Sequence, residues 1–427
     1  MIRPELFPRY TDYDPEVPVY CITPNEGRAL HRFFDTSPFS PSGRYMALLR
    51  MPQEDRLPQP GEAARVVLID LQTGEEREIA ETCGWEPQLG ANLNWGCDDH
   101  TLYFNNVDTQ TWEPYIVRMD PLTGTTSRLD GSIYRISPDG STIVSACAKR
   151  MRRTQYGYGV VVPDDRVPRN FGWAEDDGLY VTDANSRNRK LLVSIREVFE
   201  RVQPAVDLTR YADGECYGFH CKFNPQGDRL MFSLRWFRTT DPDPWHQMRH
   251  GLKFWVVTMK PDGSDIRLAV GPEQWEKKGH HINWFPDGRR LSMNLALDGD
   301  GRLYLVQVNA DGTGLRKIHD TIPGSGHPTV HSNGRHVLTD TYEREPASFG
   351  DGTVPLRWID LAAGTERAVV RVNVSNPGAR QTSALRVDPH PAWSPDGRWV
   401  AFNGFVRGTR RVFVADFRRL LLNNQNI

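Results

Sequence analysis

Short apolar runs recur along the chain and alternate with polar turns, a pattern typical of β-strands. One set of runs ends in turns rich in Pro, Asp, Asn and Gly. These turns are SPSG at Gly43, CDDH at His100, SPDG at Gly140, NPQG at Gly227, FPDG at Gly288, HSNG at Gly334 and SPDG at Gly397. Because Pro presets φ and Gly accepts a positive φ, we expect each turn to join two antiparallel strands.

A second set of turns follows other apolar runs between these hairpins. The runs are VVLID, YIVRMD, LYVTD, FWVVTM, YLVQVN and LRWID, and VFVADF ends the series. Seven turns of the first kind therefore interleave with seven strands of the second kind. Units of four short strands at this period are typical of propeller blades. We predict an all-β fold, a seven-bladed β-propeller that occupies residues 1–427 as a single domain.

The last unit, which contains VFVADF, lacks a fourth strand. The segment VPVYCITP, residues 17–24, precedes the first unit and has the composition of a strand. We predict that it pairs with residues 412–416, because this closes the ring and covers two exposed sheet edges.

Two stretches in the middle of the chain are longer than a blade requires, and we expect insertions at residues 148–173 and 190–217, within and after the third blade. The apolar spacing of LLVSIREVFERV, residues 191–202, predicts a short helix. Long insertions in compact folds often carry function or cover a site.

Composition excludes several classes of protein. The 427 residues carry a net charge of -2, so no basic excess suggests nucleic-acid binding. No apolar run approaches the roughly 20 residues of a membrane span, and the N-terminus has no apolar signal region, so we expect a cytoplasmic protein without membrane association. Six cysteines form no C-x-x-C pair, which argues against a zinc ribbon or a disulfide framework. The oligomeric state is not predictable from these features.

Four histidines share one position in successive repeats. His220, His281, His327 and His390 each stand seven residues before the glycine of a hairpin turn of the first kind. A single histidine at a strand start is more often structural or exposed, but strand packing provides no reason for four at one offset. If the strands stand side by side around an axis, the four imidazoles surround one mouth of the propeller.

Some of these histidines have the surroundings of metal ligands. Asp388 precedes His390 by two residues, so both side chains face the same side of a strand, and His327 comes from the preceding blade. Imidazole and carboxylate suit a borderline ion such as Mn²⁺ or Zn²⁺. We predict an open site of these three ligands, with His331 or a loop side chain as a candidate fourth.

The remaining histidines, His220 and His281, are then free to transfer protons, with the near-neutral pKa of an ordinary imidazole. Lys253 and Arg249 precede His281 in the chain and are candidates to hold a carboxylate. A metal ion, a base and a cation together suit removal of the proton α to a uronate carboxylate, followed by departure of the 4-linked oxygen. This reaction is a β-elimination.

The sequence resembles the oligogalacturonate lyases, seven-bladed propeller enzymes of pectin breakdown. The pair His31 and Arg32 in HRFF resembles the start of that family's first blade, and HHINWFPDG aligns without gaps with its catalytic frame T-H-E-F-W-x-P-D-G. The resemblance therefore implies that His281 is the base and that His31 and Arg32 contact substrate.

The same resemblance extends to the metal ligands. His327 stands where the family has its first metal histidine, and DPHP at residues 388–391 resembles an H-P-H-P frame, with Asp388 in place of a histidine. Leu385 occupies the position of a glutamine ligand, and Lys253 that of a substrate-binding arginine. The resemblance implies Mn²⁺ as cofactor, with Zn²⁺ or Ca²⁺ as alternatives, and a cytoplasmic enzyme.

We therefore expect a metal-assisted lyase that cleaves short uronic-acid oligosaccharides to 4,5-unsaturated products. In this hypothesis Lys253 and the ion hold the carboxylate, and His220 orients the substrate or assists the leaving group. One alternative is a lyase for another oligouronide, and a second is an enzyme that uses the metal for another step on a sugar acid. A third is a non-catalytic propeller of the TolB or WD-repeat kind that binds a protein or small ligand.

Overall fold

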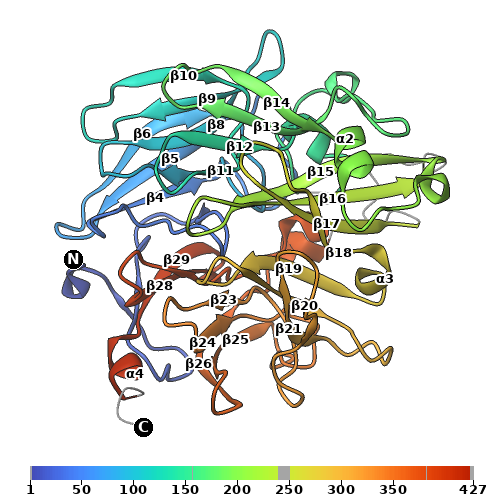
Figure 1. Cartoon of the computed structure of the whole chain (residues 1–427). Helices are drawn as coiled ribbons and strands as arrows, with labels where there is room; N and C mark the ends of the chain where they lie inside the picture. The colour runs from blue at the N-terminus through green and yellow to red at the C-terminus, as the bar shows by residue number, and fades with distance from the viewer. Residues whose placement is uncertain (1, 156, 239–250, 381, 424–427) are drawn as a thin grey trace.

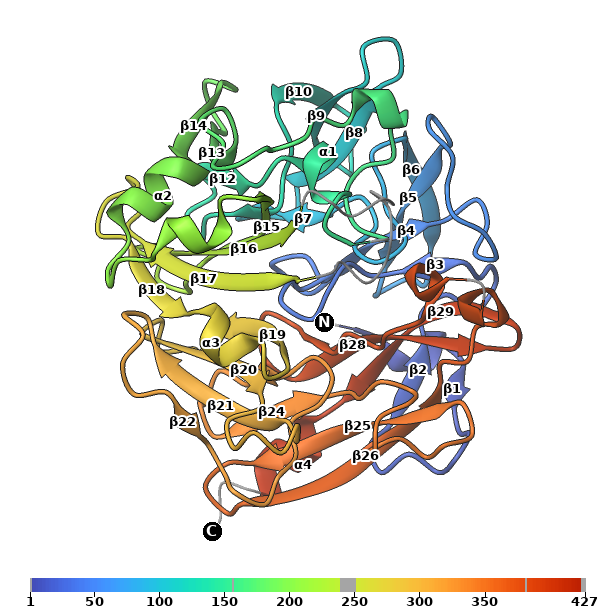
Figure 2. The same ribbon diagram turned by 90° about the vertical axis from the view of Figure 1, so that its right-hand side faces the viewer.

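The strands of the protein form seven sheets, seen in a computed structural model that describes residues 2–155, 157–238, 251–380 and 382–423. The sheets follow one another around a ring in chain order (Figure 2). The predicted seven-bladed β-propeller is confirmed.

Each of the first six blades consists of four consecutive strands that pair antiparallel in chain order. Blade 1 contains β3 (Ala29–Leu30), β4 (Tyr45–Arg50), β5 (Ala64–Asp70) and β6 (Glu76–Thr82), and blade 2 contains β7 (Asn94–Trp95), β8 (Leu102–Asp108), β9 (Glu113–Met119) and β10 (Thr126–Asp130). Blade 3 contains β11 (Arg135–Ile136), β12 (Thr142–Ser145), β13 (Gly178–Asp183) and β14 (Arg189–Ser194), and blade 4 contains β15 (Gly214–Phe223), β16 (Leu230–Arg238), β17 (Lys253–Met259) and β18 (Arg267–Val270). Blade 5 contains β19 (Gly279–Trp284), β20 (Arg290–Leu295), β21 (Tyr304–Asn309) and β22 (Arg316–Lys317), and blade 6 contains β23 (Thr329–Val330), β24 (His336–Thr339), β25 (Thr353–Asp360) and β26 (Thr365–Asn373).

The first strand of each blade lies nearest the ring axis and leaves through one of the predicted hairpin turns. In blade 5, Trp284 pairs with Leu291 across the turn, and Gly288 has φ +65°, a value that L side chains rarely adopt. Apolar side chains pack between neighbouring blades, as Leu68 of blade 1 does with Phe104 of blade 2 in one buried cluster. Turn chemistry and alternating strands therefore account for the blades.

Blade 7 contains β27 (Ala392–Trp393), β28 (Trp399–Val406) and β29 (Thr409–Asp416) from the end of the chain. Its fourth strand is β2 (Val19–Cys21), in which Val19 pairs with Ala415 and Cys21 with Phe413. A fifth strand, β1 (Arg9–Tyr10), pairs with β2, so both ends of the chain lie at this blade (Figure 1). The predicted closure by the N-terminal strand is confirmed.

Deletion of residues 1–25 should lower the midpoint of thermal unfolding by roughly 10 °C or more. The deletion removes Val17, Val19 and Ile22, which are buried, and exposes the edge of β29. Each such side chain contributes about 1.5–3 kcal/mol, and in a large domain each kcal/mol shifts the midpoint by roughly 2–4 °C. Calorimetry measures the shift, with Tyr13→Ser as control because Tyr13 is half exposed in the same segment. An unchanged midpoint after truncation would contradict the stabilising role of β2.

The helices of the described residues are short. They are α1 (Ala148–Met151), α2 (Ile195–Arg201), α3 (Pro272–Trp275), α4 (Arg418–Asn423) and 3₁₀ turns at Pro4–Leu6, Asp164–Arg166, Leu208–Tyr211, Pro377–Arg380 and Ser383–Leu385. None of these helices has the length and apolar character to cross a membrane.

The helix predicted at residues 191–202 is shorter than expected and begins at Ile195. Leu191 and Val193 instead pair with β13, so this part of the predicted insertion forms the fourth strand of blade 3. Ser194 ends the strand and caps α2, because its hydroxyl accepts a hydrogen bond from the Glu197 amide while the Glu197 carboxylate accepts one from the Ser194 amide. Apolar periodicity could not separate the end of a strand from the start of a helix.

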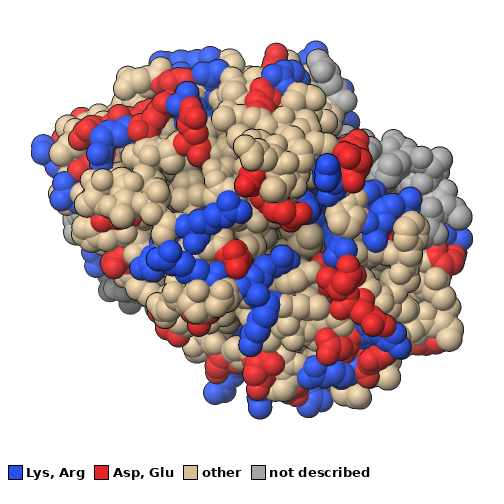
Figure 3. Space-filling view, turned by 90° about the horizontal axis from the view of Figure 1, so that it is seen from above, with Lys and Arg blue, Asp and Glu red and all other residues tan. Residues whose placement is uncertain are grey.

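Charged side chains of both signs share the face seen from above in Figure 3. Lysine and arginine gather across the middle of this face, and aspartate and glutamate lie among them. This mixture agrees with the net charge of -2 and gives that face no extended field of one sign.

Candidate active site

The four equivalent histidines meet around the ring of Phe33, which follows β3 and is fully buried. Its centroid lies 5.4 Å from that of His220, 6.1 Å from His281, 5.6 Å from His327 and 4.7 Å from His390. These histidines come from four successive blades. His220 lies in β15 and His281 in β19, whereas His327 and His390 stand two residues before β23 and β27. The predicted convergence of the shared position is therefore present, with an aromatic side chain at its centre.

Irregular backbone turns these side chains toward the axis. The pairing of β15 with β16 shifts register around His220, and that of β19 with β20 shifts around His281. His281 has φ +59° and His390 has φ +51°, both in the left-handed region. Such conformations cost a residue with a side chain about 1–3 kcal/mol and cluster at functional sites. Strand periodicity alone would not direct the imidazoles to one point.

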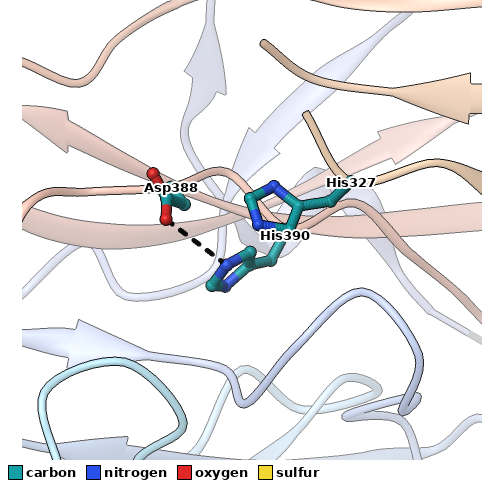
Figure 4. A group of neighbouring side chains, drawn as sticks. All are labelled: His327, Asp388 and His390. Atoms are coloured by element: carbon teal, nitrogen blue, oxygen red, sulfur yellow. Dashed lines mark ion pairs between the residues drawn. The ribbon is translucent and has the colours of Figure 1, made fainter. Parts of the chain in front are cut away.

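His327, Asp388 and His390 form a group with the geometry of metal ligands (Figure 4). One donor atom from each lies within 4.8 Å of the others, and the Asp388 Oδ2 to His390 Nε2 distance is 3.7 Å. Within the described part of the chain, His327 Nε2 and both ring nitrogens of His390 are buried without a hydrogen-bond partner. An unpaired buried polar atom costs about 1–3 kcal/mol, and each neutral imidazole has one nitrogen lone pair that fits a bound cation. Two imidazoles and a carboxylate suit Mn²⁺ or Zn²⁺.

Asp340 orients the two histidines of this group. Its carboxylate accepts hydrogen bonds from the backbone amides of His327 at 2.6 Å and His390 at 3.0 Å. It also lies 2.9 Å from His327 Nδ1. Because a carboxylate only accepts, His327 carries its proton on Nδ1, which leaves the Nε2 lone pair for a metal. Asp340 was not predicted from the sequence, since nothing in its local pattern separates it from an ordinary residue that follows a strand such as β24.

Replacement of Asp340 by Asn should weaken metal binding by about 10- to 100-fold. The amide keeps one acceptor oxygen but no longer fixes the tautomer of His327. Calorimetric titration with Mn²⁺ measures the change, and Asp396→Asn is a matched control because Asp396 lies in the exposed hairpin turn after β27. Equal Mn²⁺ affinity in Asp340→Asn and the parent protein would contradict this orienting role.

Asp388 is held by Arg386, whose Nε donates a hydrogen bond to Oδ2 at 2.8 Å. Another guanidinium nitrogen of Arg386 lies 3.4 Å from the Tyr158 hydroxyl. Leu385, at the position where the resemblance implies a glutamine ligand, is 2% exposed and apolar. The described residues therefore provide a three-ligand set in which one ligand is charged and paired with an arginine.

His281 has the hydrogen bonds of an oriented base. Its Nδ1 lies 2.7 Å from the Gly326 carbonyl oxygen, so Nδ1 carries the proton and Nε2 keeps its lone pair. Nε2 lies 3.2 Å from the Tyr342 hydroxyl, and the ring centroids of His281 and His327 are 3.8 Å apart. The basic nitrogen therefore belongs to a ring that contacts a candidate metal ligand.

The predicted near-neutral pKa of the two free histidines is not what the structure favours. Burial, followed by the neighbouring His327, holds the pKa of His281 well below the ordinary value. Burial, followed by Lys222 and Arg235, does the same for the pKa of His220. Both imidazoles are therefore neutral at physiological pH and able to accept a proton.

The remaining predicted residues do not join this group directly. His31 is fully buried, with Nε2 3.3 Å from the Pro389 carbonyl, and Arg32 donates to Asn92 at 3.0 Å; together they anchor the Phe33 loop. The Lys253 ammonium pairs with Glu276. Arg249 lies outside the described residues.

Arg235 is a cation near the site that was not predicted from the sequence. Its guanidinium carbon lies 3.5 Å from the centroid of Phe219, which stacks on His220 at 4.0 Å. Burial lowers the pKa of Arg235 to about 10, so it remains charged. One of its nitrogens donates to Gln155 at 2.7 Å. The sequence signal for Arg235 was a charged residue within the otherwise apolar run LMFSLRWF.

Two solved structures are similar to this protein over nearly the whole chain. An oligogalacturonate lyase in complex with manganese has a TM-score of 0.63 and 17% sequence identity, with 96% of each chain covered. An oligogalacturonate lyase from Vibrio parahaemolyticus has the same TM-score and 16% identity over 97% of each chain. The chain shares their propeller fold. At this identity the likeness concerns architecture.

Other similarities are more distant. The tricorn protease has a TM-score of 0.50 and 10% identity, and the match covers 92% of this chain but 36% of that one. An uncharacterized peptidase, YuxL, of Bacillus subtilis is 25% identical over 173 residues, which is 36% of this chain. The match spans 25% of the length of that curated relative. No protein family model matches the sequence.

Proposed function

We propose that this protein is a metal-assisted lyase that cleaves short, 4-linked uronic-acid oligosaccharides by β-elimination. The observation that carries the proposal is the position of His281. Its oriented ring contacts the ring of His327, which belongs to the buried group of candidate metal ligands. A binding platform of the TolB or WD-repeat kind gives no reason for that arrangement. The architecture shared with oligogalacturonate lyases supports galacturonate as the sugar.

His327, Asp388 and His390 would hold the metal ion, with Mn²⁺ as the proposed identity because one neighbour contains manganese. A bound divalent ion would neutralise the uronate carboxylate and so acidify the adjacent C5 proton. His281 Nε2 accepts that proton, the C4–O bond breaks, and the leaving oxygen takes up a proton as the C4–C5 double bond forms. His220, buried beside Phe33, lines the same region and is the proposed residue for orienting substrate.

The compartment we propose is the cytoplasm. All six cysteines are free, and Cys21, Cys216 and Cys221 are buried. Free thiols suit a reducing compartment.

Arg235 is the proposed partner of the uronate carboxylate, in place of Lys253. Its planar fork suits a carboxylate, whereas Lys253 is engaged by Glu276. Arg235→Lys should raise KM for a uronide by about 10-fold or more, because it keeps the charge and loses the fork. Lys253→Gln should change KM by less than about threefold, because the Lys253 ammonium is engaged in a partly exposed ion pair away from the site. Initial rates measure both, and the reverse order would assign the carboxylate to Lys253.

A screen of uronic-acid oligosaccharides tests the proposed activity. Digestion is followed by absorbance of the conjugated enoate, with Mn²⁺ and with EDTA, and products are identified by mass spectrometry. We expect metal-dependent formation of a 4,5-unsaturated uronide from a digalacturonate or trigalacturonate. Hydrated or isomerised products would instead indicate a different step on a sugar acid, and an inert protein would indicate a binding propeller.

A further inference from the structure

A cavity of about 740 Å³ lies at the end of the propeller axis opposite to the histidines. Its walls come from the hairpin-turn ends of the inner strands, including Asn94–Cys97, Arg135–Pro138 and Lys222–Pro225. Lys222 is two residues beyond His220 on β15, toward the turn, so the cavity and the histidines lie at different levels along the propeller axis. The cavity volume lies within the range of about 300–1,000 Å³ that is usual for small-molecule sites.

The inner wall of this cavity carries more positive than negative charge. The Asp35 carboxylate forms an ion pair with the Lys222 ammonium at 2.7 Å, and both side chains are at most 4% exposed. Arg32, which is not among the residues that line the cavity, lies 3.8 Å from the same carboxylate. Arg135 lines the cavity and donates from Nη1 to the Asp35 carbonyl oxygen at 2.8 Å, and not to the carboxylate. One carboxylate therefore faces three cations.

The directions in which the pKa values of Asp35 and Arg135 shift agree with this surplus of positive charge. Burial raises the pKa of Asp35, but Lys222, Arg32 and Arg135 together bring it below the ordinary value. Burial lowers the pKa of Arg135, although Asp35 opposes the shift. Cations that are desolvated without enough counter-charge gain when an anion binds beside them.

Donors at this wall remain available. Both hydrogen bonds of Arg135 leave from Nη1, to the Asp35 carbonyl and to Thr36, so Nε and Nη2 have no partner among the described residues. The Ser37 hydroxyl, which also lines the cavity, is buried without a hydrogen-bond partner in that same set of residues. An arginine edge and a hydroxyl are suitable donors for one carboxylate.

The side walls are aromatic and held in place. Trp95 and Trp284 line the cavity from blades 2 and 5, and each is at most 8% exposed. The Trp95 indole N–H donates to the Pro38 carbonyl at 2.9 Å, and that of Trp284 to the Lys222 carbonyl at 3.3 Å. Fixed aromatic walls around a cationic wall favour a ring-bearing anion over a bare inorganic one.

We propose that this cavity is a second ligand site, which binds a small ring-bearing monocarboxylate through Arg135. The site does not depend on the proposed lyase activity, because it shares none of the candidate metal ligands or the base. Its occupant enters from the turn face of the propeller.

Calorimetric titration with benzoate tests this site, with benzamide as the neutral isostere and inorganic phosphate as the anion without a ring. We expect saturable binding of benzoate and much weaker binding of the other two. Arg135→Gln should weaken benzoate binding by at least about 10-fold. Arg289→Gln, an exposed arginine of the β19–β20 turn outside the cavity lining, should bind as the parent does.

Arg135→Lys provides a second variant that keeps the positive charge if Arg135→Gln does not fold, as judged by circular dichroism. It should bind benzoate several-fold more weakly, because an ammonium cannot replace the guanidinium edge. Equal binding of benzoate and benzamide, no binding of benzoate, or unchanged affinity in the folded Arg135 variants would overturn the proposal.

Discussion

Replacement of His281 by Ala should reduce kcat/KM for a uronide substrate by about 10²–10⁴-fold, the usual contribution of a general base. His281 is the imidazole with one nitrogen fixed by the Gly326 carbonyl and the other facing the Tyr342 hydroxyl. Alanine removes the proton acceptor and leaves the candidate metal ligands in place. The rate of increase in enoate absorbance measures the loss.

Two further observations separate loss of the base from loss of the fold. His100→Ala is a matched control because His100 is exposed in the turn after β7, and it should keep full activity. His281→Ala should also keep the Mn²⁺ affinity of the parent, since His281 is outside the ligand group. If His281→Ala retained most of its activity, the base would have to be another residue.

The second large effect is expected from His390→Ala, which should abolish stoichiometric metal binding and lower activity by about 10²–10³-fold. Both ring nitrogens of His390 lack a hydrogen-bond partner among the described residues. Leu385 is apolar and cannot replace His390 as a metal ligand. Elemental analysis measures the metal, and activity is compared before and after treatment with EDTA. Added Mn²⁺ should restore activity to the stripped parent but not to the variant.

Thermal unfolding gives a readout of His390 that is independent of activity. Mn²⁺ should raise the unfolding midpoint of the parent, because an ion that binds only the folded state stabilises it, and should not raise that of His390→Ala. Without metal, the variant should be less stable than the parent, because alanine removes a buried ring that packs against Phe33, so the readout is the shift that Mn²⁺ causes within each protein. Absence of metal from the parent, with activity unaffected by EDTA, would contradict the metal-assisted reaction.

Local patterns determined much of the architecture. The Pro-Asp-Gly turns located the hairpins, because φ preferences act over a few residues, and the missing last strand of the final unit predicted the pairing of β2 with β29. The boundary at Ser194 was not predictable in the same way, since the apolar spacing of residues 191–202 also fits a helix. Tertiary pairing with β13 decided it.

The sequence by itself therefore determined the seven blades, the ring closure and the candidate histidines, because a repeated offset from repeated turns places equivalent residues at equivalent points. Only the tertiary structure decided the chemistry of those points. Burial made His281 neutral, and Asp340, which follows β24, selected the His327 tautomer. The packing of blade 4 brought Arg235 rather than Lys253 toward His220. Charge, tautomer and pKa depend on groups distant in the chain, so no local pattern contains them.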